Sequence, residues 1–240
     1  ITDMERKKYV IIMAAGSGTR MGAGRPKQFL ELDGKAILQK TMEVFLNACP
    51  GISVITVLPQ DFIGYWREYC LENNFVCPQI LVPGGITRFH SVRNALDRVP
   101  DGALVAVHDG VRPLVSEELV RDMFREAENV QALIPVTPCV ETMKVLENKD
   151  GKLVSIPGAK ADRSVLYGAQ TPQIFHSEIL KESYAMPYDT SFTDDASVVE
   201  KYGKSLSYIV GERLNIKITT QDDLLLARAI LSLKGQDYSL

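Results

Sequence analysis

The sequence predicts an α/β fold in which a mostly parallel sheet carries helices on both faces. Short, continuous apolar runs of strand length recur along the chain, and segments with apolar residues at helical spacing separate them. Repeated alternation of this kind is typical of parallel sheets. The 240 residues, 45% hydrophobic and 24% charged, are enough for one globular core, so we expect a single domain over residues 1–240.

The first element is a strand over residues 9–13, which is wholly apolar and ends in Ala14-Ala15-Gly16. This is the pattern of a buried parallel strand that leads into a loop. The Asp33-Gly34 pair after residues 29–32 predicts a small hairpin, and the apolar spacing after it predicts a helix. Further strands are expected at 52–58, 79–82 and 103–108, and further helices at 65–72, 91–99 and 116–128, the last with Ser116 as its N-cap.

The alternation breaks after a strand at 132–136, where prolines and an Asp150-Gly151 turn punctuate short strands predicted at 142–146 and 153–156. These strands predict a protruding β-hairpin arm at about 138–165. An arm of this size has little core of its own, so we expect it to pack on a partner subunit. Helices at 178–184 and 194–202, a strand or two within 206–218, and a helix at 221–233 complete the chain.

Composition excludes several classes of function. The formal net charge of -3 gives no general attraction for nucleic acid or an anionic membrane. No apolar run approaches the roughly 20 residues of a membrane span, and no signal-peptide pattern is found, so a cytoplasmic location is expected. The four cysteines lack Cys-x-x-Cys spacing, which argues against zinc sites and disulfides and favours small buried hydrophobes.

The main glycine-rich stretch follows the first strand and continues to Pro26-Lys27-Gln28. Gly16 and Gly18 allow main-chain N–H groups to approach phosphate oxygens, Arg20 offers a planar guanidinium and Lys27 a mobile charge. This combination suits a triphosphate, although the spacing alone also fits a solvated turn with two surface cations.

Two better-known phosphate motifs do not fit this loop. The dinucleotide fingerprint needs glycine where Met21 stands, so a nicotinamide cofactor is not expected. A P-loop needs Gly-Lys-Ser/Thr, whereas Lys27 lies between Pro26 and Gln28.

The loop, with Pro-Lys-Gln after it, resembles the signature loop of sugar-phosphate nucleotidyltransferases. Seven further motifs follow in order: Gly84-Gly85-Ile-Thr-Arg88-Phe-His-Ser91-Val92, His108-Asp109-Gly-Val-Arg112-Pro113, Glu141-Thr142-Met-Lys144, Asp162-Arg163-Ser164, Gln170-Thr171-Pro172-Gln173, Thr193-Asp194-Asp195-Ala196-Ser197 and Asn215-Ile-Lys217-Ile-Thr219. Together they resemble the 2-C-methyl-D-erythritol 4-phosphate cytidylyltransferase family over nearly the whole chain.

This resemblance implies a Rossmann-like three-layer fold and a homodimer whose arms cross to complete sites shared between subunits. It implies that Arg20 and Lys27 stabilise the phosphates of CTP and that Asp109 lies near the ribose and a Mg2+ cofactor. It places the cytosine and the acceptor at two further sets of residues. These sets are Ala14, Ala15, Gly85 and Ser91 for the cytosine, and Arg112, Thr142, Arg163 and Lys217 for the acceptor.

The residues themselves leave simpler interpretations open. Asp109 follows an apolar run and so lies at the carboxyl end of a strand, where it could bind Mg2+ or cap a turn. Lys217 could face solvent, and Arg163 could form a surface ion pair with Asp162. His108 is more simply a packed strand residue than a catalyst.

The expected reaction is attack of an acceptor phosphate oxygen on the α-phosphorus of CTP, with pyrophosphate leaving. The nucleophile is already anionic, so no strong general base is needed, and Arg20, Lys27, Arg163 and Lys217 are the expected catalytic cations. Ribitol 5-phosphate cytidylyltransferase is an alternative, although the motifs at 141–144 and 162–164 look more like the methylerythritol enzyme. The second alternative is a non-catalytic sugar-nucleotide-binding protein of the same fold.

Overall fold

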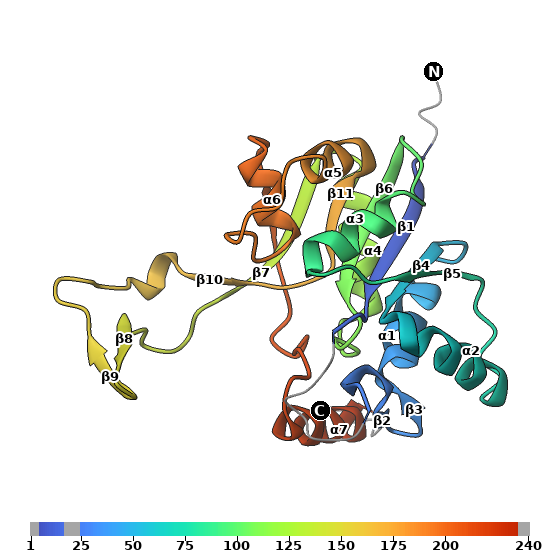
Figure 1. Ribbon diagram of the computed structural model, residues 1–240, viewed down its shortest axis with the longest axis horizontal. Coiled ribbons are helices and arrows are strands. Elements are labelled where there is room, and N and C mark those ends of the chain that lie inside the picture. The colour runs from blue at the N-terminus through green and yellow to red at the C-terminus, as the bar shows by residue number, and fades with distance from the viewer. Residues whose placement is uncertain (1–4, 17–24, 235–240) are drawn as a thin grey trace, which may run out of the picture.

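The computed structural model describes residues 5–16 and 25–234. One mixed β-sheet forms the centre of the protein (Figure 1). Its strands follow the order β10-β7-β11-β6-β1-β4-β5, and β12 pairs with β7. The parallel pairs are β1 with β4 and β6, β4 with β5, and β7 with β12. The strands are β1 (Lys7–Met13), β4 (Ser53–Leu58), β5 (Gln79–Pro83), β6 (Ala103–Asp109), β7 (Ala132–Pro138), β10 (Tyr167–Ala169), β11 (Gln173–His176) and β12 (Ser207–Val210).

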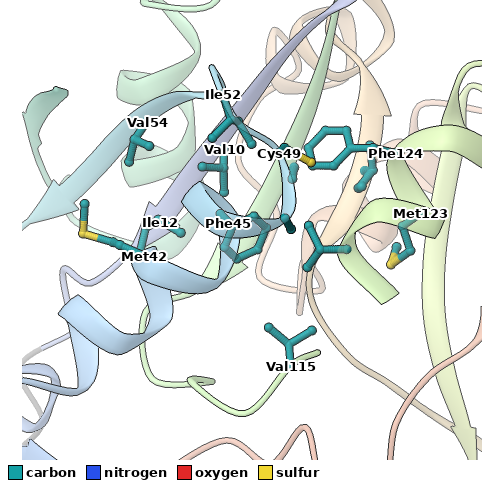
Figure 2. Packing of buried hydrophobic residues seen from close by; sticks show 14 of the residues in the cluster. Val10, Ile12, Met42, Phe45, Cys49, Ile52, Val54, Val115, Met123 and Phe124 are labelled. Carbon is teal, nitrogen blue, oxygen red and sulfur yellow. The ribbon is translucent and has the colours of Figure 1, made fainter. Parts of the chain in front are cut away.

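Helices cover both faces of this sheet because its strands are apolar on both sides. In β1, Val10 and Ile12 pack against α1 and α4, whereas Ile11 packs against α3, α5 and α6 on the other face. Figure 2 shows the first of these clusters, which contains Val10, Ile12, Phe45 and Phe124. The helices are α1 (Ile37–Ala48), α2 (Ile63–Glu72), α3 (Arg88–Leu96), α4 (Glu117–Ala127), α5 (Ser177–Tyr184), α6 (Asp195–Lys201) and α7 (Gln221–Lys234).

The predicted fold class, a Rossmann-like α/β fold with a largely parallel sheet, is confirmed. Ser116 caps α4 as expected, since its hydroxyl accepts a hydrogen bond from the N–H of Leu119 at 3.0 Å. The small hairpin after η2 (Lys27–Phe29) is also present, as β2 (Glu31–Leu32) and β3 (Lys35–Ala36).

The local structure differs from the prediction in two places. The helix predicted at 91–99 begins at Arg88, because Thr87 caps it by accepting a hydrogen bond from the N–H of His90. The antiparallel strands β10 and β11 were not predicted. The expected strand within 206–218 is β12, whereas residues 215–219 are an irregular segment.

The predicted arm is a hairpin of β8 (Leu146–Lys149) and β9 (Lys152–Ser155) that projects away from the sheet (Figure 1). Asp150 and Gly151 have φ values of 50° and 82°, as a tight two-residue turn requires, so β8 lies directly before the turn and not at 142–146. Leu153 is 70% exposed and Val165 71% exposed. The arm therefore contributes little to the core of its own chain.

Candidate active site

A pocket of about 560 Å³ opens at the carboxyl ends of β1 and β6. Ligands of open α/β sheets bind at this edge because the strand ends and the loops after them converge there. The pocket is lined by Met13, Ala14, Ala15, Gly16, Lys27, Gln28, Gly85, Ile86, Thr87, Arg88, Ser91, Asp109, Val111, Lys217 and Thr219.

The parallel register of β1 and β6 brings the end of β1 beside Asp109. Met13 is the direct partner of Asp109, and the N–H of Gly110 donates to the Met13 carbonyl at 2.9 Å. A Cβ at Gly110 would lie 3.0 Å from that carbonyl oxygen and 3.1 Å from the Ala14 Cβ. Glycine at this position therefore allows the two strand ends to approach each other.

Lys27 reaches the pocket from the short helix η2, which an aromatic anchor holds in place. Phe29 is buried, and its ring lies 5.6 Å from that of Phe62 and 5.0 Å from that of Tyr65. The stretch from Lys27 to Phe29 thus presents a cation to the pocket while its other end is fixed in the core. Lys27 therefore lines the same pocket as Ala14–Gly16, the described start of the glycine-rich stretch.

A glycine turn and the start of α3 form the opposite wall. The Ser91 hydroxyl accepts a hydrogen bond from the N–H of Gly85 and donates one to the Thr87 carbonyl, both at 2.9 Å. A Cβ at Gly84 would come within 2.5 Å of the Ala15 Cβ, so this wall packs directly on the loop after β1. Four residues predicted to frame the base, Ala14, Ala15, Gly85 and Ser91, line one pocket.

Asp109 is the acidic residue of the pocket wall, and two cations hold it. Its Oδ2 atom lies 3.1 Å from the Lys217 Nζ and 3.1 Å from the Arg112 Nε. Burial alone would raise the pKa of this carboxyl, but the positive charges of Arg88, Lys217 and Arg112 outweigh that effect and hold the pKa well below its usual range. Asp109 is therefore a carboxylate at neutral pH.

His108 fixes the backbone around Asp109 and is itself neutral. Its Nε2–H group donates to the Arg112 carbonyl at 3.1 Å, so its Nδ1 accepts the hydroxyl proton of Thr171 at 3.0 Å. The same hydroxyl accepts the N–H of Asp109 at 3.1 Å. Burial, only partly offset by these hydrogen bonds, lowers the pKa of His108 to about 4. The interpretation of His108 as a packed strand residue agrees with its complete burial.

The segment that carries Lys217 is held by hydrogen bonds that are not those of a sheet. Asn215 is fully buried, its Nδ2 donates to the Thr171 carbonyl at 2.8 Å, and its own carbonyl accepts Arg112 Nη1 at 2.7 Å. The N–H of Ile218 donates to the Val111 carbonyl at 2.9 Å. These anchors turn Lys217 toward Asp109, so its exposure does not mean that it simply faces bulk solvent.

Other predicted residues lie away from the pocket or outside the described residues. Arg112 forms an ion pair with Asp109 but does not itself line the pocket. Thr142 and Arg163 are exposed on the arm, where Arg163 Nη1 donates to the Val140 carbonyl at 3.1 Å and the Asp162 carboxylate accepts from Ser164. Gly18 and Arg20 lie outside the described residues.

Sequence reasoning missed a buried ion pair in the pocket wall. Arg88 donates two hydrogen bonds to Asp195, at 2.8 and 2.6 Å, and the Tyr184 hydroxyl donates a third at 2.6 Å. Burial alone would lower the pKa of Arg88, but the charge of Asp195 outweighs it and raises the pKa. Both residues stand in motifs that the sequence displays, but nothing in the sequence pairs residues so far apart in the chain.

Comparison with known proteins places the chain in a family. The family model described as IspD: 2-C-methyl-D-erythritol 4-phosphate cytidylyltransferase matches residues 9–233. The enzyme of that name from Porphyromonas gingivalis is 46% identical, with 95% of this chain and 100% of the relative covered. The one from Bacteroides thetaiotaomicron is 43% identical, with coverage of 94% and 100%.

Solved structures agree with this assignment. The crystal structure of 2-C-methyl-D-erythritol 4-phosphate cytidylyltransferase from Francisella tularensis is 31% identical and superposes with a TM-score of 0.76. That comparison covers 93% of this chain and 99% of the other. The matched family model, the identity of the relatives and the shared architecture together show that this chain belongs to the 2-C-methyl-D-erythritol 4-phosphate cytidylyltransferase family.

Proposed function

We propose that this protein transfers the cytidylyl group of CTP to 2-C-methyl-D-erythritol 4-phosphate and releases pyrophosphate, a step of non-mevalonate isoprenoid biosynthesis. The observation that carries the proposal is the convergence of the backbone at Ala14–Gly16, Lys27 and the Asp109–Lys217 pair on one pocket. The relatives named for this activity match across almost their whole length, which supports the same choice of substrates.

The chemistry is a phosphoryl transfer that needs positioning more than proton transfer. An oxygen of the acceptor phosphate forms a bond to the α-phosphorus of CTP, and the bond from that phosphorus to the pyrophosphate oxygen breaks. The attacking oxygen is already anionic, so no general base is required. This fits a pocket whose described lining contains no histidine, while His108 behind it is neutral and held at both nitrogens.

The charges of the pocket wall suit two polyanionic substrates. The described lining carries three cations, Lys27, Arg88 and Lys217, and one anion, Asp109. The Arg88 guanidinium is bound to Asp195, and we propose that Lys27 and Lys217 stabilise the charge that develops on the α-phosphoryl oxygens. This is why a protein with a net charge of -3 can bind polyphosphates.

We propose Mg2+ as the cofactor, with Asp109 as its protein ligand. The described residues contain no group of three or more His, Cys, Asp or Glu side chains that could hold a metal. A single carboxylate still fits Mg2+, which takes most of its ligands from water and substrate phosphates. Both ion pairs of Asp109 engage Oδ2, so Oδ1 is the oxygen expected to meet the metal. When bound, Mg2+ would neutralise charge on the phosphoryl oxygens.

We further propose that the protein is a homodimer in which the arm of one subunit completes the pocket of the other. Thr142 and Arg163 are not among the residues that line the pocket of their own chain, and the hairpin of the arm projects away from the sheet (Figure 1). Arg163 of the partner subunit would add a cation for the acceptor phosphate.

A cytoplasmic location is proposed because all four cysteines are free thiols, which suits a reducing compartment. None of the helices in the described residues is long and apolar enough to cross a membrane.

Pyrophosphate release tests the function. The four nucleoside triphosphates are each combined with methylerythritol 4-phosphate, ribitol 5-phosphate and related polyol phosphates in the presence of Mg2+. The highest kcat/KM is expected for CTP with methylerythritol 4-phosphate. Equal or faster turnover of ribitol 5-phosphate would assign the alternative acceptor. Binding of CTP without release of pyrophosphate from any pair would show a non-catalytic protein.

A further inference from the structure

Gln28 is a buried side chain whose amide holds the loop after β1. It is 1% exposed, and its Nε2 atom donates to the carbonyl of Ala14 at 2.6 Å and to the carbonyl of Gly16 at 3.3 Å. A primary amide has two N–H donors on one nitrogen, so one side chain can hold two carbonyls of the same loop. Gln28 also lines the pocket, next to the residues whose backbone it holds.

The position of Gln28 is fixed from both sides along the chain. Pro26 is buried before it, and Phe29 is anchored in the aromatic cluster after it. The N–H of Phe29 donates to the Pro26 carbonyl at 3.1 Å, which closes the turn. The amide therefore meets the loop from a rigid support, with Lys27 beside it on the same turn.

We propose that Gln28 is a positioning residue that sets the backbone of Ala14–Gly16 for the bound nucleotide. A trans peptide is planar, so a carbonyl held toward Gln28 forces the N–H group of the next residue to point the opposite way. The hydrogen bond to Ala14 thereby fixes the N–H of Ala15 before any ligand arrives. An N–H group oriented in advance binds a ligand oxygen without the cost of ordering the loop.

This inference rests on the proposed function, because it assumes that CTP binds against the loop. It differs from a purely structural role, in which Gln28 would fill space and contribute only to folding. The dependence of activity on CTP concentration distinguishes the two roles. If Gln28 only fills space, another side chain of its size can replace it without changing the affinity for the nucleotide.

The experiment compares Gln28→Met with Gln39→Met. Methionine matches the length of glutamine but donates no hydrogen bond. Gln39 is a matched control because it is 5% exposed, donates to Glu43 at 2.9 Å and accepts from Tyr69 at 2.7 Å, yet lies outside the pocket lining on α1. KM for CTP, kcat, the dissociation constant of CTP and the midpoint of thermal unfolding are measured for wild type and both variants.

We expect Gln28→Met to lower kcat/KM for CTP roughly tenfold to a hundredfold relative to Gln39→Met, although the two lose similar thermal stability. The 15N–1H resonance of Ala15 should lose its CTP-induced shift only in Gln28→Met. If Gln28→Met does not fold, Gln28→Asn decides, because its shorter amide cannot reach both carbonyls. Variants of Gln28 that keep kcat/KM within about threefold of Gln39→Met overturn the inference. A wild type that binds no CTP overturns the proposed function instead.

Discussion

Two buried aspartates of the pocket region have different roles, and their surroundings decide which. Asp195 is fully buried, and its carboxylate is bound by Arg88 and Tyr184, so its charge is neutralised within the protein. Asp109 retains 7% exposure, lines the pocket and shares one carboxylate oxygen with Lys217 and Arg112. Both residues occur in motifs visible in the sequence, but only their contacts separate the carboxylate that lines the pocket from the one that is fully buried.

We predict that Asp109→Asn changes the magnesium requirement of the protein, whereas Asp195→Asn changes its stability. Asp109→Asn should raise the Mg2+ concentration needed for half-maximal activity, since an amide oxygen is a poorer ligand for a hard dication. Asp195→Asn should instead lower the free energy of unfolding by about 1–3 kcal/mol, because Arg88 and Tyr184 exchange a charged acceptor for a neutral amide. Magnesium titrations and urea unfolding of both variants measure this, and identical magnesium curves for Asp109→Asn and wild type would remove Asp109 from the metal site.

The cysteines give a prediction that depends on pH. Cys49 is buried as expected, but Cys70, Cys77 and Cys139 are only partly buried, so the prediction of buried cysteines was wrong for these three. Burial raises the pKa of the Cys70 and Cys77 thiols to about 11. The thiolate is the reactive form, so a raised pKa leaves only about one thiol in a thousand ionised at pH 8. A more basic thiolate is also a stronger nucleophile, which offsets part of this loss. At pH 8 we therefore expect Cys70 and Cys77 to be alkylated about tenfold more slowly than an unperturbed thiol.

We therefore expect the iodoacetamide reaction of Cys70 and Cys77 in the native protein to keep rising steeply with pH through 9.5. Glutathione under the same conditions should level off near its own pKa. Peptide mass spectrometry after timed quenching resolves the two sites, and protein unfolded in urea serves as the reactive control. A plateau below pH 9.5 for the native protein would contradict the raised pKa of these thiols.

At the scale of elements, the apolar strands and amphipathic helices were predictable and the strands that complete the sheet were not. β6 is a continuous buried run, so its end at Asp109 could be placed from the sequence. β11 has four residues with Gln173 and His176 at its ends, and it acquires its strand conformation from antiparallel pairing with β6 and β7. Tertiary contacts thus determine short strands that local sequence does not specify.

The candidate site likewise contains residues that could be predicted from the sequence and residues that could not. The meeting of Ala14–Gly16 and Asp109 in one pocket was predictable, because both follow parallel strands whose carboxyl ends lie at the same edge of the sheet. Gln28, Thr171 and Asn215 were not identified as supports, because buried hydrogen bonds between distant segments leave no periodic pattern. Thr142 and Arg163 were assigned by resemblance alone, and their roles stay predictions.

Thr171 connects the end of β6 to the segment that carries Lys217, so we predict a measurable cost for removing its hydroxyl. Thr171→Val keeps the shape of the side chain but leaves the N–H of Asp109 and the Nδ1 of His108 unpaired. The free energy of unfolding should fall by about 1–3 kcal/mol for these buried groups. Urea unfolding measures it, and Thr142→Val, on the exposed arm, is the control with an expected change within about 0.5 kcal/mol. Equal stability of the two variants would show that the hydroxyl does not hold Asp109.

At the scale of the whole molecule, the chain separates a body that has a pocket from an arm that has almost no core. The arm carries large apolar side chains that are exposed, and Leu146, Leu153 and Val165 are 42%, 70% and 71% exposed. Exposed apolar side chains on a projecting hairpin favour contact with another subunit. If that subunit is a second copy of the chain, twofold symmetry requires that the arms be exchanged reciprocally.

Reciprocal exchange predicts that two inactive variants restore activity together. Lys27→Ala removes a cation from the pocket of its own body, whereas Arg163→Ala removes one from the arm that would reach the partner's pocket. When the two proteins are unfolded and refolded together in equal amounts, one site of each heterodimer collects both lesions and the other collects neither. With random pairing, about a quarter of all sites should be intact, and the pyrophosphate-release rate should recover to about that fraction of wild type.

The chain supplies a matched control for this experiment. Lys27 and Lys217 line the same pocket of one chain, so in a heterodimer of Lys27→Ala with Lys217→Ala every site carries one lesion and no activity should return. Different affinity tags on the two variants establish that heterodimers have formed. If tagged heterodimers of Lys27→Ala and Arg163→Ala are as inactive as this control, Arg163 does not complete the partner's site. The arm would then serve only to hold the subunits together.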